Sequence, residues 1–238
     1  MGTRNWSVRP IIARRRGVEI LDDPNVDPAV MTRSMADVEL ANRLFGGADA
    51  ALSEIRDTLA ELPKCASLLD VGTGTADIPA AARKLAGDNG ITLTTVGFDT
   101  SEVLLQQHRQ RSDSVVLGDA LALPFRDSSI DLVTCSQVLH HFTEADARRL
   151  ITEMNRVART RVVISDLRRS VIAAGGLWLA SFLLRFHPVS RHDGVVSVMR
   201  GFVSSELSDL VLSAVGQKPV VKNRRGFRVT TSWKPLRA

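Results

Sequence analysis

The chain has 238 residues, of which 44% are apolar and 24% charged, and its formal net charge is +5 at pH 7. This length suits one α/β domain with an additional lobe and allows a sizeable core. Tyrosine is absent and aromatic residues make up 5% of the chain, so a platform for stacking nucleic-acid bases is not expected. The excess basic residues are scattered in short runs, which predicts a solvated surface and no nucleic-acid partner.

The first residues are basic and show no apolar period, which predicts a mobile basic tail over residues 1–24. No apolar stretch of the signal-peptide type follows them, so we expect a cytoplasmic protein. The two cysteines, Cys65 and Cys135, lie far apart and outside any metal-ligand spacing. We therefore expect two buried free thiols and no metal site.

Two helices are expected in the segment 25–63, which we interpret as an N-terminal helical lid. Asp27 followed by Pro28 resembles an N-cap and a first helical position. The first helix is expected to run to about residue 45, where a glycine pair ends it. A second helix is expected over residues 48–62.

From residue 64 onward, apolar runs of strand length alternate with helical segments. Repeated strand–helix–strand units predict a mostly parallel sheet with helices on both faces. The fold class is therefore α/β, and residues 64–238 are expected to form one Rossmann-like domain. Strands are expected over residues 67–71, 92–98, 115–117, 130–135, 161–165, 219–222 and 227–233, and helices over 76–86, 101–111 and 144–157.

The pattern changes after residue 168, where we expect a helical cap over about 169–203. An apolar helix over 171–186 is followed by a polar loop at 188–194, and a further helix is expected to end near Ala214. The apolar helix is shorter than the ~20 residues of a membrane span. It could cover a hydrophobic acceptor or touch a membrane that holds one. Core or dimer packing is the alternative, and both a monomer and a homodimer remain open.

The glycine-containing segment 70–74 stands where a buried strand is expected to turn into a helix. Glycines there allow close approach of a ligand, and the helix N-terminus supplies free N–H groups. Polar residues also follow the next strands, at Asp99, at 118–120 and at 136–141. In open α/β sheets, ligands bind at these carboxyl ends. The sequence therefore predicts a nucleotide-type cofactor site.

A dinucleotide-binding domain of an NAD-dependent oxidoreductase is the competing interpretation. It would need Gly or Ala at position 77 for close approach of the pyrophosphate. Asp77 stands there instead, and its charge would repel a pyrophosphate. A sulfonium cofactor with an amino-acid tail meets no such conflict, because Asp70 can face its ammonium group.

The segments 69–75, 97–101, 118–125 and 131–142 resemble successive motifs of class I S-adenosylmethionine-dependent methyltransferases, most closely the ubiquinone/menaquinone branch. The resemblance implies a seven-stranded sheet whose last strand is antiparallel. This sequence departs from the family pattern at residues 159–161, where many relatives have a Pro-Gly-Gly-type turn. Contacts to S-adenosyl-L-methionine are expected from Asp70, Gly72, Thr73, Gly74, Asp99, Thr100, Asp119, Ala120 and Ser136, with Asp70, Gly72 and Gly74 at the methionine tail, Asp99 at the ribose and Asp119 at the adenine.

The sequence also bears on which atom would be methylated. Enzymes that methylate exocyclic or amide nitrogen usually carry an Asn/Asp-Pro-Pro-aromatic turn after the fourth strand, and residues 136–139 read Ser-Gln-Val-Leu instead. This counts against nucleobase methylation and against an RNA-binding methyltransferase-like module, the second alternative class. A histidine can deprotonate a phenol or an enol near neutral pH. His140 and His141 are candidates for this base, and Asp166 could orient it; packing or capping by the histidines and an ion pair of Asp166 with a nearby arginine are the alternatives.

The flanks of the chain also resemble a group of bacterial methyltransferases associated with polyketide and phenolic-lipid pathways, through residues 22–28 and 191–202. We therefore expect O-methylation of a hydrophobic phenolic, polyketide or quinone-precursor molecule, with ring C-methylation as the alternative. Contacts to this acceptor are expected from Trp178, Arg191, His192 and Met199, although a solvated surface turn would also explain the polar residues among them.

Overall fold

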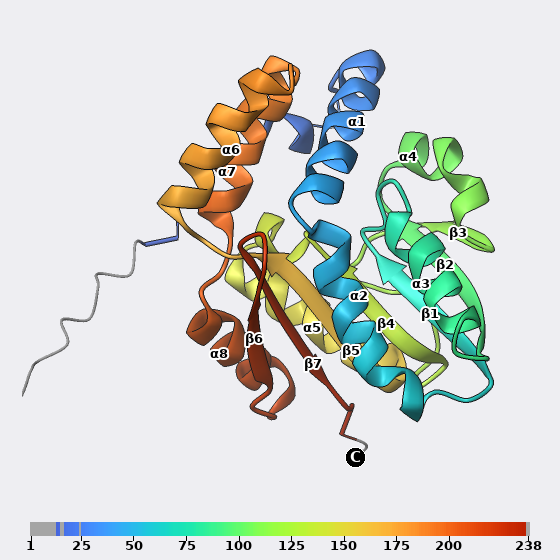
Figure 1. Ribbon diagram of the computed structural model, residues 1–238. Helices are drawn as coiled ribbons and strands as arrows, with labels where there is room; N and C mark the ends of the chain where they lie inside the picture. Colours follow the sequence, from blue (N-terminus) through green and yellow to red (C-terminus); the bar gives the residue numbers. More distant parts are fainter. Residues whose placement is uncertain (1–12, 15–16, 24, 237–238) are drawn as a thin grey trace, which may run out of the picture.

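The protein is described by a computed structural model that covers residues 13–14, 17–23 and 25–236. Figure 1 shows a twisted central sheet flanked by helices, with a separate layer of helices above one end of the strands. That layer, which we call the lid, consists of α1 (Pro28–Leu44), α6 (Val171–Leu183) and α7 (Pro188–Arg200).

The sheet contains seven strands in the order β3-β2-β1-β4-β5-β7-β6. The first five in this order run parallel, and β7 is antiparallel to both of its neighbours. The predicted α/β class and the antiparallel last strand are thereby confirmed. The strands are β1 (Cys65–Val71), β2 (Thr92–Asp99), β3 (Ser114–Leu117), β4 (Ile130–Ser136), β5 (Ala158–Leu167), β6 (Val220–Arg224) and β7 (Arg228–Trp233).

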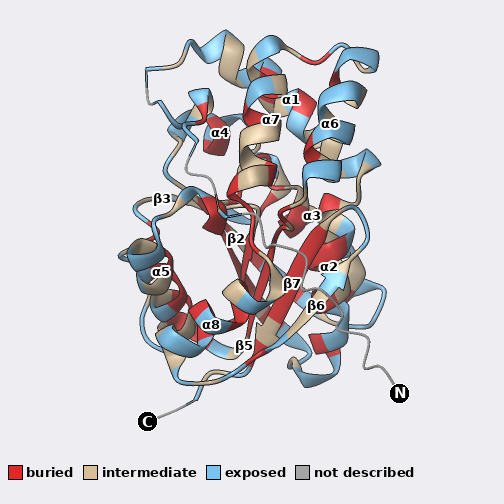
Figure 2. Ribbon diagram, turned by 90° about the vertical axis from the view of Figure 1, so that its left-hand side faces the viewer, coloured by how far each residue is buried: buried red, intermediate tan, exposed pale blue. Residues whose placement is uncertain are grey.

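Two apolar clusters join the helices to the sheet. On one face, Leu150 and Leu207 pack with Val133 of the sheet, and on the other Ile55 packs with Leu68. Figure 2 shows the buried sheet between these helical layers and the lid above it. Removing this apolar surface from water is the main favourable contribution to folding. The helices outside the lid are α2 (Gly47–Thr58), α3 (Asp77–Gly87), α4 (Glu102–Gln107), α5 (Glu144–Val157) and α8 (Ser204–Val215), and 3-10 turns lie at Ile20–Asp22, Leu59–Glu61, Arg109–Arg111 and Leu139–His141.

Local sequence sets several of the element boundaries. The Asp27 carboxylate accepts a hydrogen bond from the first turn of α1, whose N1 residue is Pro28, as predicted. Helix α5 spans the predicted residues, because Thr143 caps it. The helix expected over 101–111 is shorter and continues as a 3-10 turn. The departure noted at residues 159–161 lies inside β5, so no turn forms there.

The polar segment 188–194 forms the first half of α7, so its prediction as a loop was wrong. Pro188 occupies the first helical turn, and His187 Nδ1 accepts from the backbone two residues on. The polar side chains are used inside the lid: Asp37 of α1 accepts hydrogen bonds from Ser190 Oγ at 2.8 Å and from the His187 N–H at 2.7 Å. A helix held by buried polar contacts lacks the apolar period on which the sequence interpretation relied.

Part of the segment expected to be a mobile tail is held against the lid. The N–H groups of Ile20 and Leu21 each donate to the Asp193 carboxylate at 2.9 Å, and Glu19 is buried. Residues 17–23 therefore differ from that expectation, because buried carboxylates bind them. Residues 1–12, 15–16 and 24 lie outside the described residues.

The outer face of α6 is apolar and exposed, and includes Ile172, Leu179 and Leu183. None of the helices in the described part of the chain is long and apolar enough to cross a membrane. Cys135 is buried as expected, whereas Cys65 is exposed because it is the first residue of β1, outside the core.

Candidate active site

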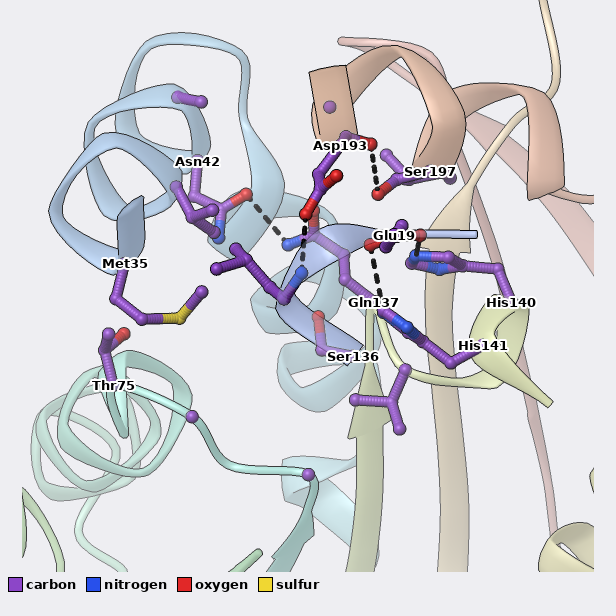
Figure 3. A pocket seen from close by; sticks show the side chains of 18 of the residues that line it. Glu19, Met35, Asn42, Thr75, Ser136, Gln137, His140, His141, Asp193 and Ser197 are labelled. Carbon is purple, nitrogen blue, oxygen red and sulfur yellow. Dashed lines mark hydrogen bonds and ion pairs between the residues drawn. The ribbon is translucent and has the colours of Figure 1, made fainter. Parts of the chain in front are cut away.

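A cavity of about 820 Å³ lies between the carboxyl ends of the strands and the lid. This volume falls in the range of roughly 300–1,000 Å³ that small-molecule sites occupy. One half is lined by the residues after β1, β2 and β4, and the other half by α1, α6, α7 and the segment 17–23. Figure 3 shows side chains from both halves facing the same space.

The glycine turn after β1 brings the backbone to the surface of this cavity. Gly72 and Gly74 have φ values of 71° and 50°, a region that glycine adopts at little cost. A Cβ at Gly72 would lie 2.4 Å from the Val138 side chain, so only glycine fits there. A Cβ at Gly74 would meet nothing within 4 Å, which leaves open space for a ligand at this turn.

Asp70 lies at the end of β1, below this turn and on the cavity wall. Its side chain accepts hydrogen bonds from Thr134 Oγ1 at 2.7 Å and from Thr73 Oγ1 at 2.9 Å. Burial raises the pKa of Asp70 to about 7, since the two hydroxyl donors offset only part of the desolvation. A cationic group placed here would restore the ionised form.

The other expected cofactor residues fall into two groups. Asp99 lines the cavity and accepts from the Gly74 N–H at 2.9 Å, and Ser136 presents a buried hydroxyl that has no hydrogen-bond partner among the described residues. Thr73, Thr100 and Ala120 also line the cavity. Asp119 does not: it is exposed and accepts from the Leu121 N–H, because it caps the turn after β3.

His140 and Asp166 form a buried pair at the opposite half of the cavity. His140 Nδ1 lies 2.6 Å from Asp166 Oδ1, and the His140 N–H donates to Asp166 Oδ2 at 3.1 Å. Burial alone would raise the pKa of Asp166. The hydrogen bonds and charge from His140 and the hydrogen bond from the Leu167 N–H lower this pKa by more than burial raises it, so the net shift is downward. An ionised Asp166 fixes the proton on His140 Nδ1 and leaves Nε2 as the acceptor.

His141 belongs to a second ion-pair group, beside the first. Its Nδ1 lies 2.8 Å from Asp22 Oδ1, and its Nε2 lies 3.9 Å from Glu19 Oε2. Burial lowers the pKa of His141, and the two carboxylates outweigh this and raise it. Arg200 Nη1 contacts both carboxylates, at 3.0 Å from Glu19 and 2.8 Å from Asp22.

The ligand atoms of Glu19, His140 and His141 all lie within 4.8 Å of one another, so the group could geometrically hold a metal ion. Its charges are already balanced in part, however, because Arg200 contacts Glu19 and the raised pKa of His141 favours the imidazolium form. A dication would have to displace these positive charges. The electrostatics therefore favour a proton at His141 over a metal.

The four expected acceptor contacts lie away from the cavity lining. Trp178 is exposed and packs against Phe182, because it lies on the outer face of α6. Arg191 stacks on the same Phe182 ring at 3.5 Å. The exposed His192 side chain pairs with the buried Asp193, and Met199 packs in a small apolar cluster within the lid.

Other residues, which sequence reasoning did not single out, line the cavity instead. From the lid come Met35, Asn42 and Asp193, and from the sheet end come Gln137 and Arg228. Gln137 has a φ of 58°, a strained value for a residue with a side chain, and its Nε2 donates to Asn42 Oδ1 at 2.9 Å (Figure 3). Asn42 interrupts the apolar stripe of α1, which is the one local signal that could have indicated it.

Taken with the glycine turn after β1 and the acidic residues at the ends of β1 and β2, this strand order defines the class I S-adenosylmethionine-dependent methyltransferase fold. Residues 69–164 match the family model described as "Methyltransferase domain". Residues 69–164 thus match a methyltransferase domain, within a sheet that has the class I strand order.

Individual relatives agree with this assignment. A demethylmenaquinone methyltransferase of Roseiflexus sp. (strain RS-1) is 33% identical over 128 residues, which cover 50% of this chain and 51% of the relative. The chain spans about half the length of this relative. A SAM-dependent methyltransferase from Aquifex aeolicus has the same fold, with a TM-score of 0.58 at 15% identity over 88% of this chain and 99% of that one. The structure of magnesium protoporphyrin IX methyltransferase from Synechocystis PCC 6803 with bound SAH matches with a TM-score of 0.55 at 15% identity. The match covers 84% of this chain and 87% of that one.

Proposed function

We propose that this protein transfers a methyl group from S-adenosyl-L-methionine to an oxygen of a small hydrophobic acceptor, of the phenolic, polyketide or quinone-precursor type. The observation that carries the proposal is the continuity of the cavity, which joins the glycine turn and Asp70 at one end to the His140–Asp166 pair at the other. One cavity therefore has room for a donor and an acceptor side by side.

The residues of the first half fit this cofactor. Among the described residues, Asp70 is a buried carboxylate without a cationic partner and the Ser136 hydroxyl has no hydrogen-bond partner, and the turn at Gly74 is open. We assign Asp70 to the ammonium of the methionine tail and Asp99 to the ribose hydroxyls. When bound, the cofactor supplies an electrophilic methyl group on a sulfonium.

In the second half, His140 is the group that we assign to the acceptor's proton. Asp166 holds the imidazole so that Nε2 accepts, and the acceptor hydroxyl would donate to that atom as its oxygen attacks the methyl carbon in line. Asp166 then stabilises the imidazolium that forms. The apolar lid residues Met35, Leu177 and Val198 exclude water and select a hydrophobic acceptor.

Ring C-methylation is the second candidate, and the similarity to a demethylmenaquinone methyltransferase favours it. The same His140 would then remove a proton from a hydroxyl that activates the ring. The two reactions give products that differ in the bond formed, so fragmentation by mass spectrometry separates an aryl methyl ether from a C-methylated ring.

The test of the proposal is in two stages. Calorimetry should show binding of S-adenosylhomocysteine and none of NAD, and the reverse would overturn the cofactor assignment. The protein is then incubated with labelled S-adenosylmethionine and small-molecule extracts, and products heavier by one CH2 unit, a methyl group in place of a hydrogen, are sought. Transfer to RNA or protein alone would contradict a small-molecule acceptor.

A further inference from the structure

Arg228 is a buried cation on the cavity wall whose hydrogen-bonding groups are largely unused. Its side chain lines the cavity, and the residue is 6% exposed. Among the described residues, its Nε has no hydrogen-bond partner. Its Nη1 and Nη2 reach only the Gly226 carbonyl and Asn42 Oδ1, each at 3.4 Å, which is long for a hydrogen bond.

The charge of Arg228 is also poorly compensated. Burial lowers the pKa of Arg228 to about 10, and the charge of Asp166 opposes this shift, so the guanidinium is still cationic at neutral pH. No carboxylate of the described residues forms an ion pair with it, and Asp166 is hydrogen-bonded to His140. Burying a charge without a partner is costly.

Arg169 shows how the same fold treats a buried arginine that serves structure. It is 7% exposed, and its guanidinium contacts the Glu206 carboxylate at 2.6 and 3.0 Å and the Gly201 carbonyl at 2.7 Å. Arg228 has the same degree of burial and none of these strong contacts. The missing partner of Arg228 is therefore expected to come from a ligand in the cavity.

The Asn42 amide links Gln137 to this guanidinium. Asn42 Oδ1 accepts from Gln137 Nε2 at 2.9 Å as well as from Arg228, so both of its lone pairs are directed at donors of the protein. Arg228, Asn42 and Gln137 all line the cavity, and the guanidinium is the charged group among these three side chains, so this wall attracts an anion.

We propose that Arg228, beside Asn42 and Gln137 on the cavity wall, binds a carboxylate of the methyl acceptor. This inference rests on the proposed function. A guanidinium on the cavity wall matches a planar carboxylate through two parallel hydrogen bonds. Arg228 begins β7, which pairs with β5 beside Asp166. Asp70 lies at the end of β1, which is separated from β5 by β4. A carboxylate bound to Arg228 would therefore lie in the acceptor half of the cavity. The acceptor that fits this arrangement is a hydrophobic acid.

The cofactor also has a carboxylate, so the experiment separates the two sources. Calorimetry on the protein saturated with S-adenosylhomocysteine compares 1-hydroxy-2-naphthoate with 1-naphthol, which differ in the carboxylate. The acid should bind at least about tenfold more tightly, a ratio equivalent to about 1.4 kcal/mol. Arg228→Met should abolish this preference and leave affinity for S-adenosylhomocysteine unchanged, and Arg228→Lys should retain part of the preference.

Three outcomes overturn the proposal. The first is that the wild-type protein shows no preference for the acid, and the second is that Arg228→Met keeps the preference. The third is that Arg228→Met weakens only the binding of S-adenosylhomocysteine, which would assign the anion to the cofactor. Failure of the wild-type protein to bind S-adenosylhomocysteine would instead refute the proposed function.

A stability measurement separates ligand binding from a structural role. Without ligand, Arg228→Met should raise Tm by about 2–4 °C, because it removes an uncompensated buried charge. The matched variant Arg169→Met should lower Tm, because it leaves Glu206 without its partner. A comparable fall of Tm in both variants would make Arg228 structural and contradict the proposal.

Discussion

The buried Asp70 makes cofactor binding dependent on pH in a way that can be calculated. Its pKa of about 7 means that roughly half of the carboxylate is ionised at pH 7 and about 3% at pH 5.5. The α-amino group of the cofactor stays protonated in this range, since such groups have pKa values near 7.7–8.0. If only the ionised Asp70 binds the ammonium, the dissociation constant should rise about fifteenfold from pH 7 to pH 5.5.

The sign follows from linkage. Bound ammonium lowers the pKa of Asp70, so binding releases a proton in this range and affinity increases with pH. Calorimetry with S-adenosylhomocysteine in two buffers of different ionisation enthalpy measures both the affinity and the released proton. The Asp70→Asn variant should bind more weakly and without this pH dependence, whereas Asp127→Asn, at an exposed site, should behave as the wild type. A wild-type affinity that is flat from pH 5.5 to 7, or an equal slope in Asp70→Asn, would refute the reasoning.

Three further predictions follow from other buried groups. His140→Ala and Asp166→Asn should each lower kcat by about 10²–10⁴-fold while S-adenosylhomocysteine affinity is retained, as measured by steady-state kinetics and calorimetry; unchanged kcat would remove the pair from the mechanism. Glu54 is buried and binds Arg224, Lys222 and Thr230, which outweigh burial and lower its pKa. Because both cations are partly exposed to solvent, Glu54→Gln should cost about 1–3 kcal/mol of unfolding free energy. That stabilisation is present above the unfolded-state pKa of about 4.3 and lost in acid, and equal Tm values for variant and wild type would contradict it. A metal chelator should leave both methyl transfer and Tm unchanged, and a loss restored by a divalent metal would show that the histidine cluster holds one.

The sheet, and the residues after β1 and β2 that line one half of the cavity, could be predicted because their signals are local. Strand-length apolar runs alternate with helical segments, and the turn after β1 must contain glycine at position 72, where a side chain would collide with Val138. Asp70 and Asp99 end adjacent parallel strands, so they meet at one edge whatever the rest of the chain does. Asp119 does not line the cavity, because a strand-end carboxylate can equally cap its own turn.

The lid and the acceptor half could not be predicted because they depend on contacts between distant residues. Asp37 of α1 holds the start of α7, and Asp193 of α7 holds residues 20 and 21. Neither carboxylate has a sequence neighbour that reveals its partner. Arg228 faces the cavity only because β7 pairs antiparallel with β5 in one register, which puts it opposite Leu167.

The two charged groups that the fold leaves poorly compensated have opposite signs. Asp70 is a buried carboxylate with hydroxyl partners only, and Arg228 is a buried guanidinium with two long hydrogen bonds. Each costs stability while its site is empty, and each matches one group of a ligand, an ammonium at Asp70 and a carboxylate at Arg228. Because a strand separates β1 from β5 and β7 lies beyond it, the two charges act on different ligands in one cavity. An acceptor that carries a carboxylate would thereby be attracted to the Arg228 end, while the cofactor's ammonium group already occupies Asp70. The same pair of charges thus orders donor and acceptor along the cavity, with the His140–Asp166 pair beside the acceptor.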